Sequence, residues 1–135
     1  MPVIRIDLPE GTPAATKAAV RDGIKAAVLG TLAPKETKYD YVAIREAFGA
    51  IGDGLPLVEI DLRPGREPAR KQALVDAIAE ILKAELDVDP ADLYVLFRET
   101  PAEHHYTGGT PLAAWVPADR SPESREDLDT RPHPR

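Results

Sequence analysis

The sequence predicts an α+β fold in which two consecutive β-α-β units form a four-stranded sheet with two helices on one face. The first indication is an internal repeat: residues 1–8 read MPVIRIDL and residues 55–62 read LPLVEIDL. The second is that each copy continues into a long segment of helical periodicity and then into another short apolar segment. Two units of similar architecture therefore follow one another along the 135-residue chain.

The repeat extends beyond its first strand. The two opening segments align at an offset of 54, which pairs Pro2 with Pro56. Further along, YVAIRE at 41–46 aligns with YVLFRE at 94–99 at an offset of 53. We therefore expect one folded domain over residues 1–116, with unit one at 1–54 and unit two at 55–116.

The first unit contains three predicted elements. Val3 to Leu8 is short, rich in β-branched residues and followed by proline and glycine, which suits a strand. A helix is predicted from Ala14 to Leu32, because its apolar residues follow helical spacing. A turn containing Pro34 then leads into a second strand at Tyr41 to Ile44.

The second unit repeats this order. Leu57 to Leu62 is the predicted strand, and Pro68 to Leu86 is the predicted helix. A turn at Pro90 precedes the last predicted strand, Tyr94 to Phe97. A β-α-β crossover leaves its two strands parallel and covers one sheet face with the helix.

The opposite face of the sheet is expected to be apolar and to be covered by other subunits, so we expect an oligomer. Residues 104–115, HHYTGGTPLAAW, contain a Gly-Gly turn that predicts a small hairpin able to fill a neighbouring subunit. Residues 117–135 are polar and rich in proline, which predicts a disordered tail.

Composition excludes several classes of function. The net charge of −6 argues against nucleic acid as a partner, because binding a duplex requires clustered Lys and Arg. No apolar run is long enough to span a membrane, and the N-terminus lacks a signal-peptide pattern. There is no cysteine, so a thiolate metal site is impossible, and we expect a cytoplasmic protein.

Pro2 is the first candidate catalytic residue. Methionine before proline is normally removed, so the mature chain is expected to begin with a free secondary amine. At the edge of an apolar strand, burial would lower the pKa of this amine from the usual α-amino range of about 7.7 to 8.0. A general base near neutrality would result.

Arg63 and Arg66 are the candidate substrate-binding residues. They flank the turn after the third predicted strand, whereas the repeat places Pro9 and Thr12 at the matching positions of unit one. Because only one copy carries the two guanidinium groups, we interpret them as serving a site rather than the fold. A carboxylate is the natural ligand of such a pair.

Three segments carry a resemblance to a known family: MPVIRIDLPEG, LRPGREPARKQALVDAI and FRETPAEHHYTGGTPLAAW. Across residues 1 to about 116 the chain resembles the tautomerase superfamily, in particular fused forms of 4-oxalocrotonate tautomerase. The resemblance implies catalysis by Pro2 without a cofactor or metal, binding of a small carboxylate substrate by Arg66, and a homotrimer. Arg63 resembles one of the paired arginines of the chloroacrylic acid dehalogenases and related hydratases.

The resemblance also suggests pocket residues and marks departures. Tyr39, His105 and Tyr106 are expected to contribute to substrate binding, His105 at a position where the tautomerases carry an aromatic wall. Tyr41 and Tyr94 occupy the places of a second catalytic arginine. Dehalogenases activate water with a glutamate at the position of Thr107, and malonate semialdehyde decarboxylase carries an aspartate at the position of Thr37.

Three hypotheses follow. The leading one is a tautomerase, an isomerase that uses neutral Pro2 on a small 2-oxo acid or its enol. If Pro2 is protonated, the same residues would serve a hydratase, a dehalogenase or a decarboxylase of malonate semialdehyde type. The third hypothesis is a non-catalytic assembly module that reuses the fold.

Overall fold

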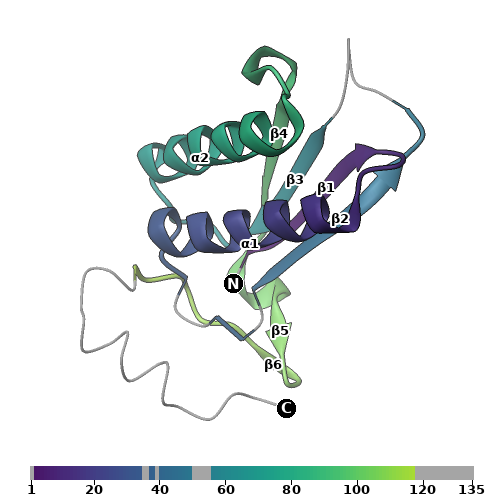
Figure 1. Ribbon diagram of the computed structural model, residues 1–135. Coiled ribbons are helices and arrows are strands. Elements are labelled where there is room, and N and C mark those ends of the chain that lie inside the picture. Colours follow the sequence, from purple (N-terminus) through teal and green to yellow (C-terminus); the bar gives the residue numbers. More distant parts are fainter. Residues whose placement is uncertain (1, 35–36, 39, 50–55, 118–135) are drawn as a thin grey trace.

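The computed structural model describes residues 2–34, 37–38, 40–49 and 56–117 (Figure 1). Two helices lie side by side across one face of a four-stranded sheet, and a short hairpin lies beyond one end of that sheet. The elements are β1 (Val3–Pro9), α1 (Ala14–Thr31), β2 (Tyr41–Ala47), β3 (Leu57–Leu62), α2 (Pro68–Leu86), β4 (Tyr94–Glu99), β5 (Tyr106–Thr107) and β6 (Thr110–Pro111), with short 3-10 helices at Pro90–Asp92 and Ala102–His104.

The sheet has the order β2-β1-β3-β4. Strands β1 and β2 run parallel, as do β3 and β4, so each β-α-β unit has the predicted parallel strands. The two units join through the central strands β1 and β3, which are antiparallel. The predicted α+β fold class is confirmed, and the antiparallel join places the start of β1 beside the end of β3.

The core lies between the sheet and the two helices. Alternate residues of β1 and β3 point towards the helices and are fully buried, as is one stripe along each helix. Gly23 lets the helices approach closely, because a Cβ there would lie 3.2 Å from the Cδ1 atom of Ile81. The fully buried core residues are Ile4, Ile6, Leu8, Val20, Ile24, Val28, Leu32, Val58, Ile60, Leu62, Leu74, Ile78 and Leu82.

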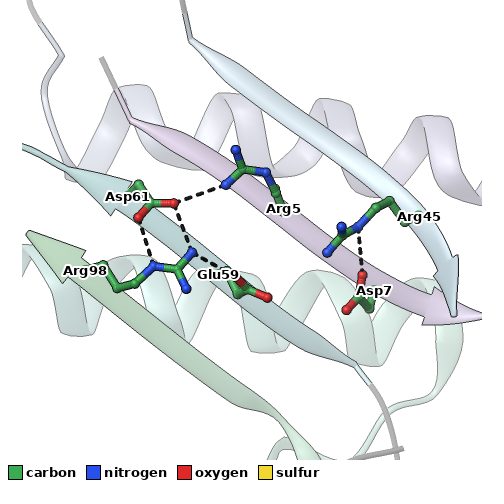
Figure 2. Close-up of polar contacts among 6 residues, drawn as sticks. All are labelled: Arg5, Asp7, Arg45, Glu59, Asp61 and Arg98. Atoms are coloured by element: carbon green, nitrogen blue, oxygen red, sulfur yellow. Dashed lines mark hydrogen bonds and ion pairs between the residues drawn. The ribbon is translucent and has the colours of Figure 1, made fainter. Parts of the chain in front are cut away.

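The opposite face is mixed rather than apolar as predicted, since Tyr41, Tyr94 and Leu96 are exposed on it beside charged side chains. That face carries a network of ion pairs between charged side chains of all four strands (Figure 2). Strand alternation explains the error, because the apolar residues of β1 and β3 that point to the helices are separated by charged ones pointing away. The pairs are Arg5–Asp61 at 3.1 Å, Arg98–Asp61 at 2.9 Å, Arg98–Glu59 at 2.8 Å and Arg45–Asp7 at 3.0 Å.

The element ends differ slightly from the prediction. Strand β2 continues past Ile44 to Ala47, because Arg45 and Glu46 pair with the last residues of β1. The hairpin at the Gly-Gly turn is present as β5 and β6. The predicted tail at 117–135 lies outside the described residues except for Pro117. Within the described ranges, neither helix is long and apolar enough to cross a membrane.

Candidate active site

Pro2 opens strand β1 at the end of the sheet where the candidate site lies. It is buried, and its carbonyl oxygen accepts a hydrogen bond from the backbone N–H of Tyr41 at 3.3 Å. This bond continues the parallel pairing of Val3 with Tyr41. The first residue of the predicted mature chain is therefore fixed to β2 and shielded from water.

The two predicted arginines lie at the same end. Because β1 and β3 are antiparallel and Val3 faces Asp61, the turn that follows Leu62 begins beside the start of β1. Arg63 and Arg66 are both in this turn and only 5% and 3% exposed. The fold thus brings two buried cations to the end of the sheet that holds Pro2.

Arg66 is held on two sides. Its Nε atom donates to the carbonyl of Leu32 at 3.0 Å, and its guanidinium lies 4.4 Å from the ring centroid of Trp115. Its Nη1 and Nη2 atoms are buried and have no hydrogen-bond partner among the described residues. Burial, with the charge of Arg63 next in importance, lowers the pKa of Arg66 to about 10, so it stays cationic at neutral pH.

Trp115 connects this turn to the end of α1. Its indole N–H donates to the carbonyl of Ala33 at 3.1 Å, and Arg70 donates to the carbonyl of Thr31 at 3.2 Å. Carbonyls at a helix C-terminus carry partial negative charge, which favours cations there. Gly65, at φ +123°, is needed because a Cβ would lie 3.2 Å from Trp115.

Arg63 is anchored separately from Trp115. Its Nη1 atom donates a hydrogen bond to the carbonyl of Ala113 at 2.6 Å.

Asp40 is a titratable residue of this region that the sequence analysis did not single out. Its Oδ1 atom is buried and has no hydrogen-bond partner within the described ranges. Burial raises the pKa of Asp40 to about 6, although the positive charges of the amino terminus, Arg66 and Lys25 act in the opposite direction. The repeat offered a signal, since the matching residue of unit two is Leu93.

The other predicted pocket residues are His105, Tyr106 and Tyr39, and they differ in burial and in whether the structure describes them. The Nε2 atom of His105 lies 2.6 Å from the hydroxyl of Thr100. Burial, together with the charges of Arg63 and the amino terminus, lowers the pKa of His105, so it is largely neutral at pH 7. Tyr106 lies on β5 and is 61% exposed. Tyr39 lies outside the described residues.

At the pseudo-equivalent end of the sheet, Pro9, Thr12 and Leu93 occupy the positions that match Arg63, Arg66 and Asp40. There Pro56 opens β3, and its carbonyl accepts the N–H of Tyr94 at 3.5 Å. The turn after β1 is closed by the hydroxyl of Thr12, which donates to the carbonyl of Pro9 at 2.7 Å. Among the described residues, no three His, Asp or Glu side chains are grouped so that they could hold a metal ion.

Known proteins share this fold. Residues 56–114, the second unit and the hairpin, match the family model described as "Tautomerase enzyme". A symmetric trimer of a wild-type fused 4-OT is 25% identical, with 82% of this chain and 95% of that chain covered and a TM-score of 0.71. An asymmetric trimer of another fused 4-OT is 24% identical, with 81% and 94% covered and a TM-score of 0.71.

A more distant structural neighbour is described with a different activity. Malonate semialdehyde decarboxylase, described with decarboxylase and hydratase activities, is 15% identical, with 77% of this chain and 88% of that chain covered and a TM-score of 0.60. No curated protein sequence matches significantly. The second unit therefore matches the tautomerase family, and the two units together have the fold of fused 4-OT and malonate semialdehyde decarboxylase.

Proposed function

We propose that the protein is a cofactor-independent tautomerase, an isomerase acting on a small 2-oxo acid or its enol. Pro2 carries the proton, and Arg66, helped by Arg63, binds the substrate carboxylate. One observation carries the proposal: Arg66 is 3% exposed, yet its two Nη atoms have no partner within the described part of the chain. Two such nitrogens can bind one carboxylate through parallel hydrogen bonds.

The mechanism needs only these groups. The neutral secondary amine of Pro2 removes a proton from the substrate and returns it to another carbon. Negative charge then develops on the enolate, and the buried guanidinium of Arg66 stabilises it in a region of low dielectric. Of the other predicted pocket residues, His105 lines the site as a neutral side chain, and Tyr39 and Tyr106 complete the pocket in the assembled protein.

Asp40 favours a second candidate function. A carboxylate near the amine stabilises the ammonium form of Pro2, which would act as a general acid. Such a site would hydrate an unsaturated acid, dehalogenate its halogenated analogue or decarboxylate a β-oxo acid. The decarboxylase and hydratase activities described for malonate semialdehyde decarboxylase support this alternative. A non-catalytic assembly module is the third candidate.

We also propose a homotrimer. The fused 4-OT structures are described as trimers. The open sheet face combines the ion-pair network with large side chains that are about half exposed, Tyr41 at 51% and Tyr94 at 50%. Association of three copies would remove these tyrosines from water.

Arg66→Gln tests the binding role directly. The variant removes the guanidinium, so kcat/KM for ketonisation of phenylenolpyruvate should fall by about 10²- to 10³-fold. Arg21→Gln on α1 is the matched control, because Arg21 is exposed and pairs with its chain neighbour Asp22 at 2.9 Å. Unchanged kcat/KM in Arg66→Gln, with its fold verified by circular dichroism, would refute carboxylate binding by Arg66.

A further inference from the structure

The strand register brings Asp40 next to Pro2, although the tautomerase mechanism does not use it. The parallel register pairs Val3 with Tyr41, and one step back along both strands the same register brings Pro2 to Asp40. The hydrogen bond from Tyr41 to the carbonyl of Pro2 at 3.3 Å holds the strands together at this step. Neighbouring strands run about 4.8 Å apart, so the two residues are immediate neighbours.

The side chains of both residues belong on the helix side of the sheet. Val3 and Tyr41 lie on the open face, so the residues one step before them alternate to the opposite face. The observed burial agrees, since Pro2 is buried and Asp40 is partly buried. The Oδ1 atom of Asp40 is out of contact with water and has no partner in the described part of the chain. A buried carboxylate oxygen in this condition favours a nearby cationic donor.

The charges around Asp40 come from three elements. Arg66 faces it from the turn after β3, Lys25 from α1, and the amino terminus from the start of β1. The Nε atom of Arg66 already donates a hydrogen bond to the carbonyl of Leu32. On the side of the hairpin, the positive charges of Arg63 and of the amino terminus both act on His105. Asp40 is thus an acidic group among several cations, with Glu99 also acting on Arg66 and Asp61 on His105.

The repeat shows that the fold does not require this acid. The residue of unit two that matches Asp40 is Leu93, which packs against the hydrophobic core. The two units differ in the same way at the turn after their first strand: unit two has Arg63 and Arg66 where unit one has Pro9 and Thr12. The carboxylate and the two cations therefore occur together at one end of the sheet and are absent together from the other described end.

We propose that Asp40 is a positioning residue whose carboxyl shares a proton with the amine of Pro2 and raises the fraction of that amine that is protonated before substrate binds. The inference rests on the proposed function in taking Pro2 as the amino-terminal residue. Asp40 stabilises the charged amine, whereas Arg63 and Arg66 oppose the charge. The balance between these groups decides whether Pro2 starts the reaction as an acid or as a base.

The test is a ¹⁵N NMR titration of the Pro2 nitrogen, after intact mass has verified removal of Met1. In Asp40→Asn the pKa of Pro2 should fall by about one unit, a tenfold change in its proton equilibrium. Asp40→Glu should stay close to wild type, because it keeps the charge. Asp92→Asn is the matched control, since Asp92 is exposed in the turn before β4, at the opposite end of the sheet.

An unchanged Pro2 pKa in Asp40→Asn would overturn the inference. If that variant does not fold, Asp40→Ser gives the same comparison, and again an unchanged pKa is the contrary result. Failure of the proposed function looks different: Pro2→Ala would keep full ketonisation activity, while the effect of Asp40 on the Pro2 pKa would still be measurable in the parent protein.

Discussion

Arg66 combines deep burial with unused hydrogen-bonding capacity. The ring of Trp115 and the carbonyl of Leu32 fix the plane of its guanidinium, with Nε bonded at 3.0 Å. A side chain that is already ordered loses little entropy when it binds a ligand. Its burial removes water that would compete for the Nη atoms, so a carboxylate gains more from them there than on an exposed surface.

Asp40 should affect stability in a pH-dependent way. Burial raises its pKa from 3.8 to about 6, so ionisation is less favourable in the folded protein than in the unfolded chain. The stability present below about pH 4 is therefore partly lost as pH rises through about 6. Asp40→Asn should be more stable than wild type at pH 8 by about 1 kcal/mol, less than the full shift implies because water reaches part of the side chain.

Urea unfolding at pH 4 and pH 8 measures this difference. Asp92→Asn serves again as the exposed control and should follow the wild type at both values. A variant Asp40→Asn that gains nothing on going from pH 4 to pH 8 would show that the carboxyl is not destabilised by burial.

At the scale of elements, glycine is favoured in one turn by its backbone conformation, whereas in helix α1 alanine would fit in its place. Gly30 lies in the last part of α1, and an added Cβ meets nothing within 4 Å. Gly11, in the turn after β1, has φ +84°, a conformation that L-residues rarely adopt. Gly30→Ala should therefore stabilise the protein by about 0.5–1 kcal/mol, and Gly11→Ala should destabilise it by about 1 kcal/mol or more.

Thermal denaturation of the two variants beside the wild type checks this pair of predictions. Both glycines are exposed, so the comparison isolates backbone conformation from packing. Equal shifts in Tm in the same direction would contradict the assignment of the helix and of the turn.

The elements were largely predictable, because apolar periodicity records which side of each element is buried. Leu57–Leu62 and Pro68–Leu86 were predicted with the bounds that the structure has. The ion pairs of the open face were not predicted. Charged side chains such as Arg5 and Asp61 pair across strands, and the strand register that brings them together cannot be read from the sequence pattern. Asp40 was missed for the same reason: its place beside Pro2 follows from strand pairing rather than from local pattern.

The whole molecule uses a pseudo-symmetric scaffold asymmetrically. Two β-α-β units meet through antiparallel strands, which creates two similar ends of the sheet. One end gathers Pro2, Asp40, Arg63 and Arg66, and the other has a hydroxyl-closed turn at Thr12. Both units therefore contribute similar elements to the core, whereas this group of charged residues lies at one of the two described ends of the sheet.

The oligomeric state can be predicted at this scale. Sedimentation at micromolar concentration should give roughly three times the chain mass of 14.7 kDa. Asp61→Asn leaves Arg5 and Arg98 without their common acidic partner on the open face, so it should shift the equilibrium towards smaller species. A wild-type protein that sediments as a monomer would contradict the proposed trimer.

The central claim is that the amine of Pro2 performs the chemistry, and steady-state ketonisation of phenylenolpyruvate tests it most directly. Pro56→Ala is the matched control, because Pro56 is also buried and also accepts a hydrogen bond from the following strand, but is internal. We predict that Pro2→Ala lowers kcat/KM by about 10²- to 10⁴-fold, the range expected for loss of a general acid–base group, and that Pro56→Ala retains activity. Activity retained in Pro2→Ala, in a protein of unchanged fold and assembly, would contradict the account.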